Sequence, residues 1–91
     1  MDKLIIRAIT KNERAKDRYT VYYNDGSYFS VDEHEVSRRK NLKLTDQVRL
    51  LRALNQGCFL DVNEKLINFF DLPSSVQSEI IIATRKAEKE S

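Results

Sequence analysis

The first third of the chain alternates apolar and polar residues in a way that is typical of β-strands. β-Branched residues are frequent in residues 4–10, and residues 18–23 and 27–31 combine β-branched with aromatic residues. An Asn-Asp-Gly run at residues 24–26 separates the last two segments, and such a run is typical of a tight hairpin turn. The pattern therefore predicts three antiparallel strands arranged as a hairpin meander.

The turn allows two registers, and they differ in which side chains face the core. A two-residue loop would place Tyr22 opposite Phe29. A three-residue loop, with Gly26 in the left-handed conformation, collects apolar side chains on one face, and a slip of one residue would reverse that face. We therefore expect the three-residue loop. Its inner face would carry Tyr19, Val21, Tyr23, Phe29 and Val31. Its outer face would carry Thr20, Tyr22, Tyr28 and Ser30.

The remainder of the chain carries helix starts and helical spacing. Asp32 can cap a short helix that ends near Asn41, with Val31 and Val36 closing as a hydrophobic staple. Three further helices are predicted near residues 46–56, 62–70 and 74–88. Their starts are marked by Thr45, by the Asp61 capping arrangement and by Pro73, and Gly57 ends the first of the three. The inward side of the helix at 46–56 would carry Val48, Leu50, Leu51 and Leu54. That of the last helix would carry Val76, Ile80, Ala83, Thr84 and Ala87.

These elements define one α+β domain over residues 1–91, a length that suits a single domain. Its fold would be a three-stranded antiparallel β-sheet, in a hairpin meander, followed by a small bundle of about four helices. Residues 1–44 would form the β-hairpin segment with the short helix. Residues 45–91 would form the helical segment, which has room for a single three-helix module.

Composition favours a folded protein of the cytoplasm. Apolar residues make up 41% of the chain and charged residues 33%, which is the balance of a small core under a charged surface. The longest apolar run, residues 80–83, has four residues, whereas a membrane span needs roughly 20. The first residues do not resemble a signal sequence, and the single cysteine, Cys58, cannot form an intramolecular disulfide.

Few residues are suited to catalysis or to metal binding. The only histidine, His34, lies between two glutamates, and nothing provides the orienting group that a pair with Cys58 would need. One Cys and one His cannot make a four-ligand zinc site, and the two glycines are too far apart for a phosphate loop. We therefore expect no enzyme activity, no metal, no cofactor and no small-molecule substrate.

The formal net charge of +2 is unevenly distributed. Residues 1–44 hold ten basic and seven acidic residues, whereas the remainder holds six and seven. The candidate residues for binding a nucleic acid or an acidic partner are Lys11, Arg14, Lys16, Arg18, Tyr22, Tyr28, Arg38, Arg39 and Lys40. If the two basic groups converge, the tyrosines between them would suit a nucleic-acid backbone or a single strand. Basic residues in loops and at helix ends are usually solvated, and this is the favoured explanation for the same positions.

Three consecutive isoleucines, residues 80–82, cover more than one side of a helix. Apolar residues at helical spacing usually belong to a core. At least one of the three must nevertheless face outward, which makes Ile81 and Ile82 candidates for contact with a protein partner or with a second copy in a homodimer.

Four stretches of the first half form a recognisable pattern: Ile9-Thr10-Lys11, Asp17-Arg18-Tyr19-Thr20-Val21-Tyr22, Asp25-Gly26-Ser27-Tyr28-Phe29-Ser30-Val31-Asp32-Glu33 and Leu42-Lys43-Leu44. On these residues, the segment from about residue 5 to residue 50 resembles the N-terminal segment of the RecX family of recombination regulators. The resemblance implies a non-enzymatic protein that binds a RecA-type recombinase filament, with or without its DNA, and restrains strand exchange. An alternative is an interaction module or inhibitor, derived from a phage or mobile element, that binds no nucleic acid.

Overall fold

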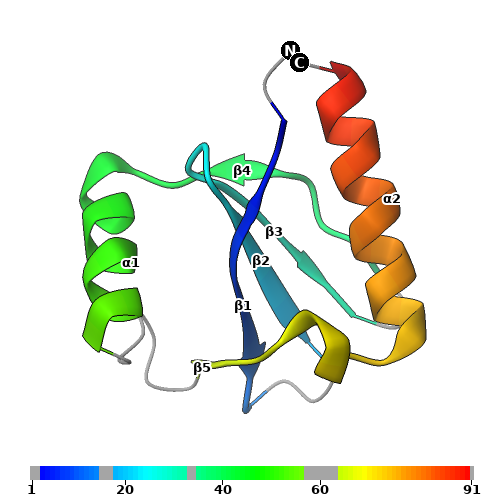
Figure 1. The fold of residues 1–91 in the computed structure, drawn as a ribbon, viewed down its shortest axis with the longest axis horizontal. Helices are drawn as coiled ribbons and strands as arrows, with labels where there is room; N and C mark the ends of the chain where they lie inside the picture. The colour runs from blue at the N-terminus through cyan, green and yellow to red at the C-terminus, as the bar shows by residue number, and fades with distance from the viewer. Residues whose placement is uncertain (1–2, 15–17, 33–34, 57–63, 91) are drawn as a thin grey trace.

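The computed structural model describes residues 3–14, 18–32, 35–56 and 64–90 (Figure 1). Its elements, in chain order, are β1 (Ile6–Asn12), β2 (Tyr19–Tyr23), β3 (Ser27–Val31), β4 (Lys40–Asn41), α1 (Leu44–Gln56), β5 (Glu64–Leu66), the 3₁₀ turn η1 (Phe69–Asp71) and α2 (Ser74–Glu90).

The strands form one antiparallel sheet in the order β4-β3-β2-β1-β5. The predicted fold of three strands and about four helices is therefore wrong, because the described residues form five strands and two α-helices. The meander of β1, β2 and β3 was predicted correctly, and it makes up the centre of the sheet. The two additional strands are short segments that pair at its edges.

The predicted register between β2 and β3 is confirmed. Val21 pairs with Phe29 and Tyr22 with Tyr28, so that three residues form the loop, and Gly26 has a φ of +86°. This left-handed conformation costs a glycine little, because glycine has no Cβ. The backbone N–H of Ser27 donates to the Asp25 carboxylate at 2.9 Å, which closes the turn from its other side.

The predicted short helix after Asp32 is wrong, since the described residues that follow pair with β3 and include β4. The Asp32 carboxylate does accept a hydrogen bond from the N–H of Glu35, at 2.7 Å, but the Asp32 N–H donates to the Glu35 carbonyl at 2.9 Å. Val31 and Val36 then pair as a β-bridge. An aspartate caps turns as readily as it caps helices, and here the backbone pairing beside β3 decides between the two.

The predicted helix near 62–70 is also wrong within its described residues. Glu64–Leu66 form β5, which pairs with the end of β1, and the N–H of Ile67 extends this pairing to the carbonyl of Ile9 at 2.9 Å. The residues Asp61 to Asn63 and Gly57 lie outside the described part of the chain. Thr45 lies within α1 rather than before it, because the first helical hydrogen bond accepts at Lys43.

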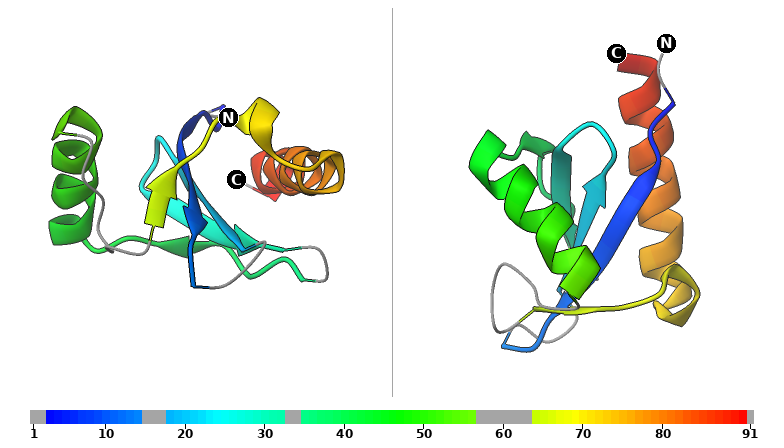
Figure 2. Two further views of the ribbon diagram at one scale, coloured as in Figure 1. Left: turned by 90° about the horizontal axis from the view of Figure 1, so that it is seen from below. Right: turned by 60° about the vertical axis from the view of Figure 1, so that its left-hand side comes forward.

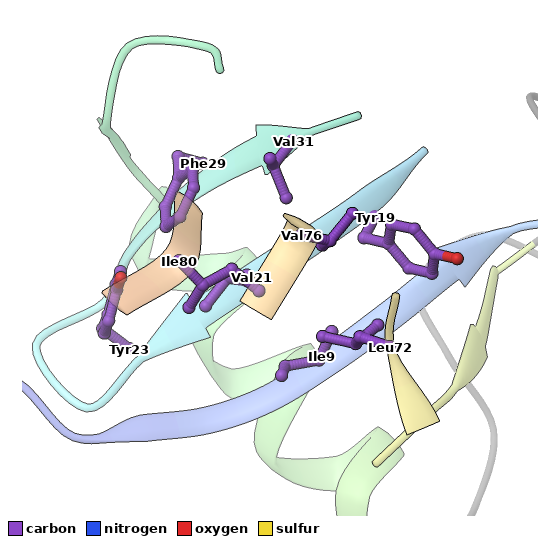
Figure 3. Packing of buried hydrophobic residues seen from close by; sticks show 9 residues of the cluster. All are labelled: Ile9, Tyr19, Val21, Tyr23, Phe29, Val31, Leu72, Val76 and Ile80. Atoms are coloured by element: carbon purple, nitrogen blue, oxygen red, sulfur yellow. The ribbon is translucent and has the colours of Figure 1, made fainter. Parts of the chain in front are cut away.

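The two helices cover opposite faces of the sheet (Figure 2). Helix α2 begins after Pro73, as predicted, and its expected inward stripe is confirmed: Val76, Ile80 and Ala87 are buried, and Ala83 and Thr84 are half-buried. Figure 3 shows Val76 and Ile80 among the side chains of the strands. The main core consists of Ile9, Tyr19, Val21, Tyr23, Phe29, Val31, Leu72, Val76 and Ile80.

A smaller apolar cluster lies between α1 and the other face of the sheet. Leu50 packs there against Ala8 and Tyr22, with Tyr28, Leu42 and Leu54 at its border. Tyr22 was expected on an outer face, and α1 covers that face, so its side chain is buried. The expected inward side of α1 is only partly right, since Val48 and Leu51 are exposed. Neither described helix is long and apolar enough to cross a membrane.

Candidate functional site

The predicted basic residues come from two parts of the sheet. Lys11 pairs with Tyr19 at the end where β1 leads into β2, and Arg14 and Arg18 flank the same connection. Lys40 pairs with Tyr28, close to the turn between β2 and β3. Lys16 lies outside the described residues, as do His34 and Cys58. Arg18 and Ser37, the residue before Arg38, line one small pocket, so the two basic groups approach each other at this edge of the sheet.

The two tyrosines predicted to contact a nucleic acid lie beneath and beside α1. Their rings stack with centroids 5.9 Å apart, but Tyr22 is only 4% exposed and its hydroxyl donates to the Glu64 carboxylate at 3.2 Å. Burial, followed by the charge of Glu64, raises the pKa of Tyr22. Tyr22 is thus part of the packing beneath α1, and its ring is not accessible for stacking on a base.

Arg38 and Arg39 do contribute to a cleft, which is lined by residues of α2 and of the segment before β4. Figure 1 shows where these two elements lie in the fold. The volume of the cleft is about 640 Å³. One wall is the segment from Val36 to Arg39, and the other is the last two turns of α2. The lining residues are Tyr23, Phe29, Val36, Ser37, Arg38, Arg39, Ala83, Lys86, Ala87 and Glu90.

The wall that carries the arginines is attached firmly to the edge of the sheet. The N–H of Ser37 donates to the Ser30 carbonyl at 2.8 Å, and the N–H of Ser30 donates back to the Ser37 hydroxyl at 2.7 Å. With the bridge between Val31 and Val36, these bonds fix the backbone from which Arg38 and Arg39 project. A fixed backbone lowers the entropy that a bound ligand has to remove.

The floor of the cleft is aromatic and uncharged. Tyr23 and Phe29 stack with centroids 6.0 Å apart, and both rings are buried. The Tyr23 hydroxyl and Thr84 Oγ1 are 2.6 Å apart, and Thr84 donates to the carbonyl of Ile80 at 2.7 Å, so Tyr23 is the donor of the first pair. Burial raises the pKa of Tyr23, which keeps this hydroxyl neutral. Charges above such an apolar floor interact more strongly than they would in water.

The charged residues that line the cleft are mostly positive. Arg38, Arg39 and Lys86 provide three cations, and Glu90 provides one carboxylate. Arg39 Nη1 also lies 3.7 Å from Asp25 Oδ2 in the neighbouring turn, which restricts its position. Burial would raise the pKa of Asp25, but the hydrogen bonds from Ser27 and the charge of Arg39 outweigh it and lower that pKa. The cleft is therefore arranged to attract an anion.

Lys86 was missed in the sequence, because a single lysine on an amphipathic helix is usually no more than a solvated residue. A signal was nevertheless present. Ala83 and Ala87 stand four residues apart on the side of α2 that faces the cleft, and their small side chains leave it open. Lys86 adjoins this pair, and Glu90 follows it by one turn.

Ile81 and Ile82, the two isoleucines predicted at an interface, do face outward. Their neighbour Ile80 is buried and belongs to the main core. Ile81 is 43% exposed and Ile82 is 62% exposed. Ile81 borders a shallow groove of about 330 Å³ that Leu4 and Phe69 also line. A role for either isoleucine in a homodimer or in contact with a partner stays a prediction.

Comparisons with protein-family models, with curated proteins and with solved structures found no match for this chain.

Proposed function

We propose that this protein is a non-enzymatic binding protein whose cleft holds the phosphodiester backbone of a nucleic acid. The observation that carries the proposal is the convergence of Arg38, Arg39 and Lys86 on one cleft. Two of these residues come from a strand-like segment and one comes from α2, so the fold, rather than a run of basic residues, brings them together.

Arginine suits this ligand because its planar guanidinium can donate two parallel hydrogen bonds to one phosphate, and lysine adds a point charge. The volume of about 640 Å³ is enough for a short segment of a polyanion. Since the aromatic floor is buried, the contacts would be to the sugar-phosphate backbone, and binding would depend little on base sequence.

The hydroxyl groups at the cleft support a binding role. The Ser37 hydroxyl accepts a hydrogen bond from Ser30, and that of Tyr23 donates to Thr84. Both groups are used to hold the walls and the floor in place. We infer from this a role in binding rather than in catalysis, and we keep the cytoplasm as the expected compartment.

The RecX-like segment narrows the proposal to the nucleic acid of a RecA-type recombinase filament. Residues 5–50, which carry the resemblance, include the whole meander and the wall that holds Arg38 and Arg39. The filament presents a DNA backbone, so the cleft and the resemblance agree on the kind of ligand.

The test is the binding of a labelled single-stranded oligonucleotide, measured by fluorescence anisotropy at several salt concentrations. The double variant Arg38→Ala, Lys86→Ala should bind at least about tenfold more weakly, and its salt slope should fall by about 1.4, since two phosphate contacts are lost. The matched control is Arg14→Ala, an exposed cation at the other end of the sheet, and it should bind like the wild type. Equal weakening in both variants, or in neither, would refute a role of the cleft.

A second measurement tests the narrower proposal. The wild-type protein should lower the DNA-dependent ATP hydrolysis of a RecA-type recombinase, and the double variant should not. If the wild-type protein binds DNA but leaves the hydrolysis rate unchanged, the recombinase is not its target and the binding proposal stands alone.

A further inference from the structure

Asp25, in the turn between β2 and β3, is an acidic residue beside the basic cleft. It does not line the cleft, but its Oδ2 atom lies 3.7 Å from Nη1 of Arg39, which does. If its charge were its only effect, this carboxylate would weaken the attraction of the cleft for a polyanion. The hydrogen bonds of the turn point to a second effect, on the position of Arg39.

The two oxygens of the Asp25 carboxylate have different partners. Oδ1 accepts hydrogen bonds from the backbone N–H of Ser27, at 2.9 Å, and from the Ser27 hydroxyl. Ser27 is itself buried, so both donors are fixed within the fold. Oδ2 is the oxygen that faces Arg39. The carboxylate is therefore held at one oxygen and directed towards the arginine with the other.

The turn is also attached to the segment that carries Arg39. The N–H of Leu42 donates to the carbonyl of Gly26 at 2.8 Å, and Ser27 pairs with Asn41 of β4, which lies beside the turn (Figure 1). These bonds set the distance between the carboxylate and the backbone of Arg39. A charge at a fixed place restricts a long side chain that would otherwise have many rotamers.

The contact with Asp25 leaves the guanidinium able to bind a ligand. A separation of 3.7 Å is longer than a hydrogen bond, so Asp25 attracts Arg39 without using its N–H donors. Burial raises the pKa of the Tyr23 hydroxyl, and the charge of Arg39 opposes that rise, which agrees with a guanidinium close to the floor of the cleft. Arg39 is thus restricted at a place where its donors can meet a phosphate.

We propose that Asp25 is a positioning residue for the cleft, and that it strengthens the binding of a phosphodiester backbone although both carry negative charge. It restricts Arg39 before the ligand arrives, and this lowers the entropy that binding has to remove. The inference rests on the proposed function of the cleft. It adds a requirement that the three cations alone do not contain.

Anisotropy with the labelled single-stranded oligonucleotide separates positioning from charge. Asp25→Asn removes the charge, and its amide oxygen can still accept from Ser27, so the turn is retained. This variant should bind about three- to fivefold more weakly, although the protein gains positive charge. The matched control is Asp46→Asn, because Asp46 also lies 3.7 Å from an arginine, Arg49, in the helix on the other face of the sheet (Figure 2). It should bind as tightly as the wild type or slightly more tightly.

Two further measurements involve no change of charge or no ligand. Ser27→Ala removes the hydroxyl that holds Asp25, so binding should weaken about twofold or more while circular dichroism shows a folded protein. Nitrogen relaxation in NMR measures the mobility of the Arg39 Nε–H in the free protein. Its order parameter should exceed that of Arg14, an exposed residue, and should fall towards the Arg14 value in Asp25→Asn.

The outcomes distinguish this inference from the proposed function. Equal or tighter binding by Asp25→Asn, an equal loss in Asp46→Asn, or an Arg39 order parameter that Asp25→Asn leaves unchanged would each overturn the inference. The weaker binding of the Arg38→Ala, Lys86→Ala variant would then still support the cleft. Absence of oligonucleotide binding by the wild type would instead refute the proposed function, and this inference with it.

Discussion

The hydroxyl of Tyr23 joins the centre of the sheet to α2, and removing it gives a sharp test of the packing. The Tyr23 ring is 1% exposed, and its hydroxyl lies 2.6 Å from Thr84 Oγ1. Thr84 in turn donates to the carbonyl of Ile80 at 2.7 Å. The two hydroxyl groups therefore form a series of hydrogen bonds with a fixed direction: Tyr23 donates to Thr84, and Thr84 donates to the carbonyl of Ile80.

This direction makes the two single substitutions unequal. Tyr23→Phe keeps the ring and leaves Thr84 bonded to Ile80, so it should lower the free energy of unfolding by about 1 kcal/mol. Thr84→Val keeps the shape but leaves the Tyr23 hydroxyl buried without an acceptor, which should cost about 2 kcal/mol. The double variant has no unpaired hydroxyl, and it should be about 1 kcal/mol more stable than the sum of the single effects indicates.

Urea unfolding of the wild type, both single variants and the double variant, followed by circular dichroism, measures all four free energies. The dependence on urea concentration should be the same in each, because the exposed surface on unfolding does not change. Tyr28→Phe, at a half-buried ring beneath the other helix, is the control and should shift the free energy by less than about 0.5 kcal/mol. Additive effects on the free energy of unfolding, or a larger loss in Tyr23→Phe than in Thr84→Val, would show that Tyr23 does not donate its hydrogen bond to Thr84.

Two further predictions concern the turn between β2 and β3. Gly26→Ala should lower the free energy of unfolding by about 1–2 kcal/mol, because Gly26 has a positive φ and an added Cβ would lie 2.8 Å from the Gln47 side chain. A loss below about 0.5 kcal/mol in urea unfolding would contradict this reasoning. The pKa of Asp25 is lowered, so its stabilising contribution is complete above its ordinary value of 3.8 and is lost as the pH falls through the folded-state pKa. The stability difference between the wild type and Asp25→Asn, measured by thermal unfolding, should therefore shrink in acid, and a difference that grows there would refute the assignment.

The parts of the fold that depend on residues close together in the sequence were predictable from the sequence. The register of the hairpin follows from the conformation that Gly26 can adopt and from the alternation on either side of it. Helix α2 follows from Pro73 and from a stripe that repeats over about three turns. In both places the local preference and the final packing agree.

The errors arose where the partner of a segment is distant in sequence. Asp32 can cap a turn or a helix, and its choice depends on the pairing of the following residues with β3. Glu64–Leu66 have no strong strand pattern, and they form β5 because the edge of β1 offers its hydrogen-bonding groups. The cleft has the same origin, because Arg38 and Lys86 meet only through the docking of α2.

The unequal size of the two apolar clusters divides the molecule into parts of different local stability. Helix α2 is anchored in the main core, whereas α1 is held by the small cluster around Leu50. Such differences produce sub-global opening, in which a weakly packed element exchanges its amide hydrogens while the rest stays folded. The amides of α1 should therefore exchange long before those of β2 and α2.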